Sequence, residues 1–232
     1  MLDLNKTTKF VLDLKKSVGL EGTLAAVTVV LDRSGSMHSL FFKGDVSNTL
    51  SRVLPLSMAF DDNGEIDLIT FSSNASNRDP ITPRMYTSGN LQEYVMRIGT
   101  SGSTNYADAL HKVINMDYEV RREGGLFGIG AKEVYNRKEN APKCKRFVIF
   151  ITDGDCDEDA ITETKKLMEK INSKELDIFI KFLGLGNSSF SMLSSFQRAY
   201  PKVCDFFKVH PSWLSSSSDE EFYSQLLKGF TK

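Results

Sequence analysis

Short, uninterrupted apolar runs alternate along the chain with longer stretches in which apolar residues recur every three or four positions. The short runs predict strands at 23–31, 66–71, 147–151, 178–183 and 203–209, with a short edge strand near Ile81. The periodic stretches predict helices at 46–58, 91–98, 107–120, 159–171, 191–200 and 219–230. Strands that are apolar throughout are typical of parallel strands covered on both faces. The pattern therefore predicts an α/β fold with a doubly wound, mostly parallel central sheet flanked by helices on both faces.

Two segments depart from this alternation. Residues 1–22 fit a weak strand-like alternation and an amphipathic helix equally well. We therefore treat them as an N-terminal extension whose secondary structure the sequence does not decide. Residues 23–232 then form one domain with an insertion at 119–145, because connections from helix to strand are usually much shorter. The insertion holds the glycine-rich run 124–130, which is compatible with a functional loop, a small hairpin, a mobile lid or a tolerated surface insertion.

The first predicted strand ends in an acidic and hydroxyl-rich segment, Asp32-Arg33-Ser34-Gly35-Ser36. Two other loops carry oxygen donors, since Thr104 precedes a predicted helix and Asp153 follows the strand at 147–151. In open α/β sheets, ligands bind outside the carboxyl ends of the strands. Hard cations such as Mg²⁺ prefer oxygen ligands and keep part of their water shell. Three such loops at one sheet edge predict a site for a divalent cation.

In these segments the chain resembles the von Willebrand factor A-type (VWA) domain. The residues that match the family's metal-ion-dependent adhesion site (MIDAS) are Asp32, Ser34, Ser36, Thr104 and Asp153. The resemblance covers about residues 23–232, and the stretch 55–66 also looks like the VWA domains linked to bacterial tellurium resistance. It implies that the hydroxyls of Ser34, Ser36 and Thr104 bind the metal directly, whereas the two aspartates act mostly through water.

The resemblance also implies a cofactor and a partner. The expected metal is Mg²⁺, with Mn²⁺ or Ca²⁺ as alternatives, and the expected partner is a protein that supplies a Glu or Asp to the metal. We therefore expect a metal-dependent protein-binding module, without catalytic residues, in a tellurium-resistance or stress-response system. It is not expected to be an enzyme.

Two other functions stay open at this stage. One is a Mg²⁺-dependent phosphohydrolase-like enzyme that uses Asp32 and Asp153, although a dehalogenase-like phosphatase would need a second acid where Ser34 stands. The other is a structural VWA domain that binds through the 124–130 loop without metal, which exposure of Leu126, Phe127 and Ile129 would favour.

An EF-hand loop starting at Asp153 is excluded. The glycine and the glutamate that such a loop requires are replaced by Glu158 and Thr164. The acids that follow Asp153 are instead interpreted as solvated residues at the start of a helix, and they are Asp155, Asp157, Glu158 and Asp159.

Composition excludes several further classes. With 29 basic and 30 acidic residues the formal net charge is −1, so the chain lacks the basic excess of a nucleic-acid-binding protein. No apolar run approaches the roughly 20 residues needed to cross a bilayer, and the first residues do not form a signal-peptide pattern. Three scattered cysteines, Cys144, Cys156 and Cys204, do not form a disulfide framework. We expect a cytoplasmic protein with neither a nucleic-acid nor a membrane partner.

Overall fold

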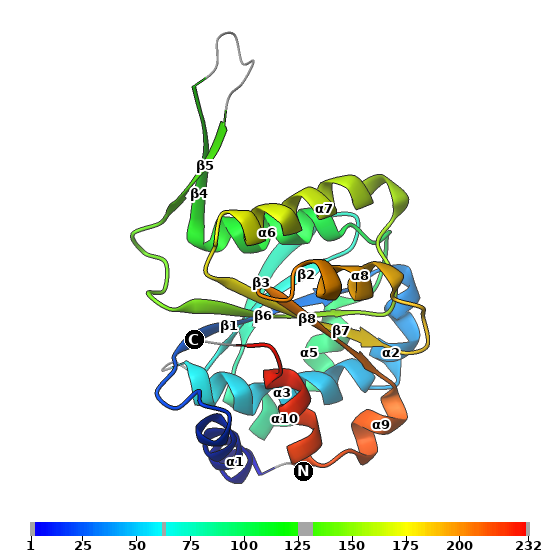
Figure 1. Ribbon diagram of the computed structural model, residues 1–232. Coiled ribbons are helices and arrows are strands. Elements are labelled where there is room, and N and C mark those ends of the chain that lie inside the picture. Colours follow the sequence, from blue (N-terminus) through cyan, green and yellow to red (C-terminus); the bar gives the residue numbers. More distant parts are fainter. Residues whose placement is uncertain (1–2, 62–63, 125–131, 231–232) are drawn as a thin grey trace.

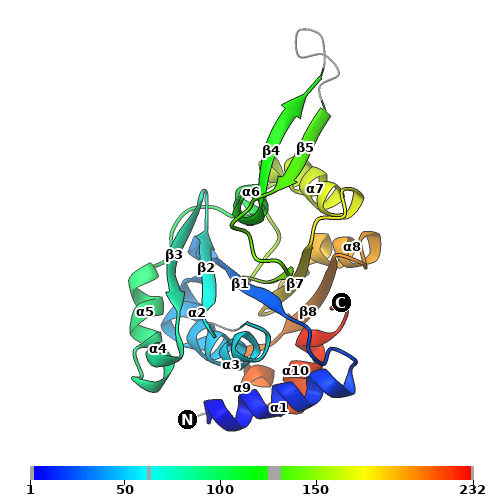
Figure 2. The ribbon, with the colours of Figure 1, turned by 90° about the vertical axis from the view of Figure 1, so that its left-hand side faces the viewer.

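The computed structural model describes residues 3–61, 64–124 and 132–230, and a six-stranded sheet lies at its centre (Figures 1 and 2). Along the sheet the order is β3-β2-β1-β6-β7-β8. The strands are β1 (Ala25–Asp32), β2 (Ile66–Phe71), β3 (Ala75–Ile81), β6 (Lys145–Thr152), β7 (Ile178–Leu185) and β8 (Cys204–Val209). Only the edge strand β3 runs antiparallel to its neighbour among the paired strands of this sheet in the described residues. The predicted α/β class is confirmed.

Helices cover both faces of this sheet. The helices on one face are α1 (Leu4–Ser17), α2 (His38–Phe42), α3 (Asp45–Phe60), α4 (Pro83–Thr87), α5 (Leu91–Ile98), α9 (Pro211–Ser216) and α10 (Asp219–Leu227). The helices on the other face are α6 (Tyr106–Asp117), α7 (Glu158–Ser173) and α8 (Ser191–Ala199). None of the helices in the described ranges combines the length and the apolar character that a membrane span requires.

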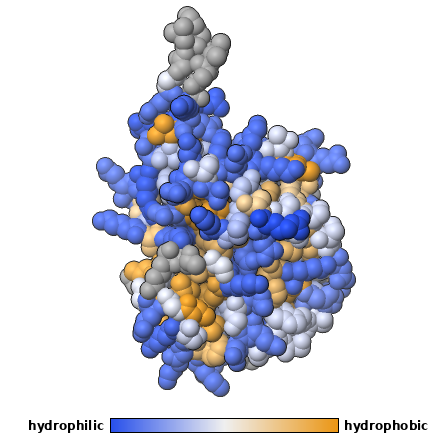
Figure 3. All heavy atoms as spheres, in the orientation of Figure 1, coloured by the Kyte–Doolittle hydropathy of each residue, from blue (hydrophilic) through white to orange (hydrophobic). Residues whose placement is uncertain are grey.

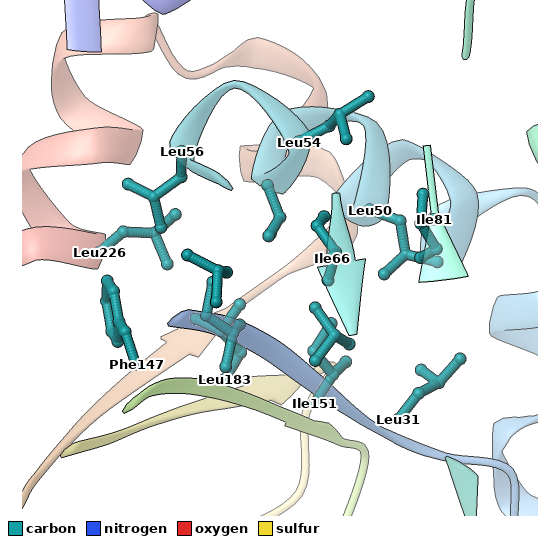
Figure 4. Close-up of a cluster of buried hydrophobic side chains, with 14 of the residues drawn as sticks. Leu31, Leu50, Leu54, Leu56, Ile66, Ile81, Phe147, Ile151, Leu183 and Leu226 are labelled. Carbon is teal, nitrogen blue, oxygen red and sulfur yellow. The ribbon is translucent and has the colours of Figure 1, made fainter. Parts of the chain in front are cut away.

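The two faces explain why β1 is apolar throughout. Its side chains alternate between the two cores, with Val29 and Leu31 in one and Val30 in the other, and all eight of its residues are buried. Figure 4 shows the first core, where Leu31 and Ile151 of the sheet lie below Leu50 of α3. Burying a side chain of this size stabilises the fold by about 1.5–3 kcal/mol. Opposed cores hold β1 and β6 rigidly at the centre of the sheet.

The described part of the N-terminal extension, residues 3–22, is held by tertiary contacts. The helix α1 packs against α3 and α10, with Val11 fully buried. Lys15 is buried as well, and its Nζ donates hydrogen bonds to Thr23 O at 2.9 Å and Ala59 O at 2.6 Å. The ammonium also lies 3.9 Å from the centre of the Phe60 ring.

A second sheet occupies the insertion. Strands β4 (Tyr118–Glu123) and β5 (Lys132–Arg137) form an antiparallel hairpin that projects from the body of the domain (Figure 1). The prediction of a helix up to residue 120 is wrong, because α6 ends at Asp117 and Tyr118 already has extended backbone. Buried Arg146 binds Asp117 and holds the helix end there. Of the run 124–130 only Gly124 is described; Leu126, Phe127 and Ile129 lie outside the described residues.

Candidate metal centre

The register of the central strands explains why three distant segments meet. Leu31 of β1 pairs with Ile151 of β6, so the parallel strands end side by side with Asp32 next to Thr152. The chain leaves β1 toward β2 on one side and returns to β6 on the other, with helices on opposite faces. A crevice opens at such a switch point at the carboxyl ends of the strands.

Asp32 is completely buried at this edge, and neutral donors orient its carboxylate. Its Oδ1 accepts a hydrogen bond from Ser34 N at 2.7 Å, and its Oδ2 accepts one from Thr152 Oγ1 at 2.6 Å. The hydroxyl of Tyr106 donates in turn to Thr152 Oγ1 at 3.0 Å. Burial raises the pKa of Asp32 to about 6, more than the hydrogen bonds from Thr152 and Ser34 lower it.

Hydrogen bonds connect three further predicted residues. Ser34 Oγ and Ser36 Oγ lie 3.1 Å apart, and Ser36 Oγ donates to Asp153 Oδ1 at 2.8 Å. Asp153 is half-buried, and burial raises the pKa of its carboxyl. Hydroxyl and carboxylate oxygens from the β1 and β6 loops thus form one continuous cluster.

Thr104 belongs to a third loop that is tied to the first. Gly35 N donates to Gly102 O at 3.1 Å, and Ser101 N donates to Arg33 O at 2.8 Å. The backbone of Thr104 is held on both sides by Asp157, since Thr104 N donates to Asp157 Oδ2 and Asp157 N donates to Thr104 O, each at 2.9 Å. Within the described residues the Thr104 hydroxyl has no hydrogen bond to a protein group, so it is available to a ligand.

Sequence reasoning missed the residues that position this cluster. Arg33 joins its own loop to two others, donating to Gly99 O at 3.1 Å and Ser101 Oγ at 2.9 Å in the loop before α6 and to Ser72 Oγ at 3.3 Å in the loop after β2. The only sequence signal for Thr152 is that it is a polar residue at the end of an apolar strand. Arg33 was marked only by being a cation inside an otherwise small, hydroxyl-rich loop.

The interpretation of the later acids as solvated residues is wrong for two of them. Asp157 fixes Thr104, and Asp155 accepts hydrogen bonds from Ser191 N at 3.0 Å and Ser191 Oγ at 2.8 Å, at the start of α8. Glu158 and Asp159 are exposed, as expected. No spacing in the sequence predicts these contacts, because each one joins two segments that only the fold brings together.

The electrostatics of the site fit a hard cation. In the described part of the chain, no lysine or arginine forms an ion pair with Asp32 or Asp153, although the two carboxylates raise each other's energy. A buried carboxylate without a compensating charge is costly. Two carboxylates and three hydroxyls suit Mg²⁺-like ions, and the described residues include no cluster of three or more His, Cys, Asp or Glu that suits a nitrogen- or sulfur-loving metal.

The model of a family described as "vWA found in TerF C terminus" matches residues 24–232. The chain belongs to this VWA family. It is 29% identical over 231 residues to the uncharacterized protein YcbR of Bacillus subtilis (strain 168), an alignment that covers 99% of this chain and 84% of YcbR.

Solved structures show the same fold at low sequence identity. A von Willebrand factor type A protein from Catenulispora acidiphila has a TM-score of 0.58 at 13% identity, over 90% of this chain and 43% of that one. The manganese-loaded TRAP protein of Plasmodium vivax has a TM-score of 0.54 at 14% identity, over 88% and 72%. Proximal thread matrix protein 1 of the mussel byssus, with a zinc-occupied MIDAS motif, has a TM-score of 0.50 at 16% identity, over 84% and 46%. The VWA domain thus spans less than half of two of these chains.

Gly102 gives a testable prediction about this site. Its φ is +81°, and an added Cβ would lie 2.8 Å from Ser73 Oγ, which accepts a hydrogen bond from Ser103 N. Gly102→Ala is expected to lower the free energy of unfolding by about 1–3 kcal/mol and to weaken divalent-cation binding, because the Thr104 loop must shift. Urea denaturation and cation titration measure the two effects.

Gly89→Ala is the matched control, since Gly89 has φ +73° but no neighbour within 4 Å of an added Cβ. It carries the same backbone strain without the clash, so its loss of stability should be smaller and its cation affinity unchanged. Equal effects of both substitutions on stability and affinity would contradict the role given to Gly102.

Proposed function

We propose that this VWA domain is a metal-dependent protein-binding module. The hydroxyls of Ser34, Ser36 and Thr104 would hold a divalent cation, Mg²⁺ with Mn²⁺ or Ca²⁺ as alternatives, and Asp32 and Asp153 would orient its water ligands. The bound cation supplies a positive point at the surface of the domain. A Glu or Asp side chain of a partner protein docks on that point, because the protein ligands that touch the cation directly are neutral.

One observation carries this proposal: two carboxylates and the hydroxyls of Ser34 and Ser36 gather at a switch point beside the Thr104 loop, and no cationic side chain in the described residues neutralises the carboxylates. Charge balance calls for an external cation at this place. The metal-loaded structural neighbours support the same reading. Membership of the family found in the TerF C terminus supports a place in a tellurium-resistance or stress-response system.

The geometry of Asp32 supports binding over phosphohydrolase chemistry. A nucleophilic aspartate needs an oxygen that can reach a substrate. Asp32 is completely buried, and each of its oxygens already accepts a hydrogen bond from the protein. We therefore propose that this carboxylate supports the site and that the domain has no catalytic residue.

Calorimetric titration of the chain with Mg²⁺ and Mn²⁺ tests the proposal. Wild type is expected to bind at one site, and Asp32→Ala and Asp153→Ala are expected to abolish that binding. Asp159→Ala is the matched control, because Asp159 is an exposed acid two residues from Asp157 and outside the cluster. Its binding should equal that of wild type.

Docking of a carboxylate is tested separately. A fluorescein-labelled oligoglutamate peptide is expected to gain affinity for wild type when Mg²⁺ replaces a chelator, and this gain should vanish in Asp32→Ala. Folded wild type that binds neither cation, or a peptide affinity that is the same with Mg²⁺ as with the chelator, would overturn the proposed function.

A further inference from the structure

The hairpin β4–β5 is firmly anchored at its base. Arg146 donates to Asp117 Oδ2 at 2.6 Å and to Asp117 Oδ1 at 2.7 Å, directly before β4 begins. Tyr118 Oη accepts a hydrogen bond from Asp177 N at 2.8 Å, and Arg137 donates to Cys144 O at 2.6 Å. An isolated two-stranded hairpin is only marginally stable. These contacts anchor the base of the hairpin to the body of the domain.

A groove lies between this hairpin and the C-terminal half of α7. Its volume is about 630 Å³, and we call it the basic groove, after the residues that line it: Arg122, Gly124, Lys132, Glu133, Tyr135, Lys170 and Lys174. The side chains of Arg122 and Glu133 come from paired positions of the two strands. Figure 3 shows that hydrophilic residues cover most of the described surface of the hairpin in that view.

Positive charge dominates the basic groove. Four basic residues face one carboxylate, which leaves three positive charges in excess (4 − 1 = 3), whereas the whole chain carries −1. Glu133 is already engaged by Lys170, whose ammonium lowers the pKa of that carboxyl, and Arg122 lies 3.9 Å from its other oxygen. In the described ranges no carboxylate forms an ion pair with Lys132 or Lys174. Both ammonium groups are therefore free to bind an anion.

The helix dipole of α7 explains only part of this cluster of basic residues. Lys170 and Lys174 lie at the C-terminus of α7, where the helix dipole favours positive charge. Arg122 and Lys132, however, come from the hairpin, and their strands have no such dipole. Two independent elements thus direct cations to the same cavity.

We propose that the basic groove binds an acidic segment of a partner protein. Charge complementarity selects an anionic occupant, and Tyr135 offers it an aromatic surface. A nucleic acid or an anionic membrane would present a long line of negative charge. The chain as a whole carries a net charge of −1, and α7 also exposes Glu169, so the protein lacks the extended positive surface that such a polyanion needs. A short acidic segment needs only the groove itself.

The basic groove is separate from the candidate metal centre. Thr104 precedes α6 and the hairpin follows it, and this helix of 12 residues is about 18 Å long. Removing the metal therefore leaves the groove intact. In a variant with the groove charges reversed, K132E/K174E, the gain in peptide affinity on adding Mg²⁺ reports on the metal centre alone, so each proposal can fail without the other.

Fluorescence anisotropy with the labelled oligoglutamate peptide, at low ionic strength and with a chelator present, tests the groove. Wild type and Asp32→Ala are expected to bind equally, and affinity should fall as salt is added. The double variant K132E/K174E is expected to lose affinity at least about tenfold. The matched control K9E/K165E changes the net charge equally at two exposed lysines outside the groove, and it should bind like wild type.

Thermal unfolding of both double variants shows that they are folded before binding is compared. No binding to wild type in chelator, equal losses in the two double variants, or undiminished binding to K132E/K174E would each overturn the proposal. Groove-dependent binding of a DNA oligonucleotide or of phosphatidylserine vesicles that exceeds peptide binding would also overturn it, because the occupant would then be a different polyanion.

Discussion

Replacing Arg146 with methionine is expected to lower the free energy of unfolding by about 3–5 kcal/mol. The side chain of Arg146 is 3% exposed and that of Asp117 is 1% exposed, so both charges are buried. Two parallel hydrogen bonds join them. Methionine keeps much of the side-chain volume but removes every donor. Asp117 would then be a buried carboxylate without a counter-charge. Urea denaturation followed by circular dichroism measures the loss.

Two further variants isolate the cause of that loss. Asp117→Leu combined with Arg146→Met removes both charges, and the double variant should recover much of the stability that the single variant loses. Arg97→Met is the control for an exposed pair, since Arg97 and Glu93 are 66% and 68% exposed, and it should cost less than about 1 kcal/mol. A double variant no more stable than Arg146→Met would show that packing, not charge, is responsible.

Asp32→Asn is expected to stabilise the metal-free protein at neutral pH by about 2–3 kcal/mol. Burial raises the pKa of Asp32 from 3.8 to about 6 in the folded state, so the folded chain holds this proton more tightly than the unfolded chain. The stability that protonated Asp32 contributes is therefore present at low pH, and it is lost as the pH rises from the unfolded-state pKa of 3.8 through the folded-state pKa of about 6. Asparagine keeps the size of the side chain but cannot ionise.

Denaturation curves in chelator over a range of pH measure this difference. The advantage of Asp32→Asn should be full above about pH 6 and should vanish below about pH 4. Saturating Mg²⁺ should stabilise wild type and leave Asp32→Asn unchanged, because only the wild-type carboxylate benefits from a cation. A pH-independent difference between the two proteins would contradict the assigned pKa shift.

The meeting of the Asp32 and Asp153 loops was predictable from the sequence for a physical reason. Asp32 and Asp153 each directly follow an apolar strand, and parallel strands end at the same edge of a sheet. Position along a strand therefore predicts position in space. The position of Thr104 is predicted less directly, because its loop precedes a helix and has no strand directly before it.

Contacts between polar residues that are distant in the sequence could not be predicted from it. Asp157 was interpreted as a solvated acid, yet it holds Thr104, which lies 53 positions away in the sequence. Likewise α6 was expected to continue to residue 120, and its end at Asp117 depends on Arg146, 29 positions later. Local periodicity carries no information about such pairs, since their energy arises only when the segments meet.

By itself, the sequence determined most strands of the central sheet, its mostly parallel character and the loops that carry Asp32, Ser34, Ser36 and Asp153, because the hydrophobic period and the alternation of strands with helices are local properties of the chain. The tertiary structure alone decided that residues 4–17 form a helix, that the insertion forms an anchored hairpin, and that Arg122 and Lys174 share one groove. Burial and charge pairing between remote segments decide these features, and they exist only once the chain has folded.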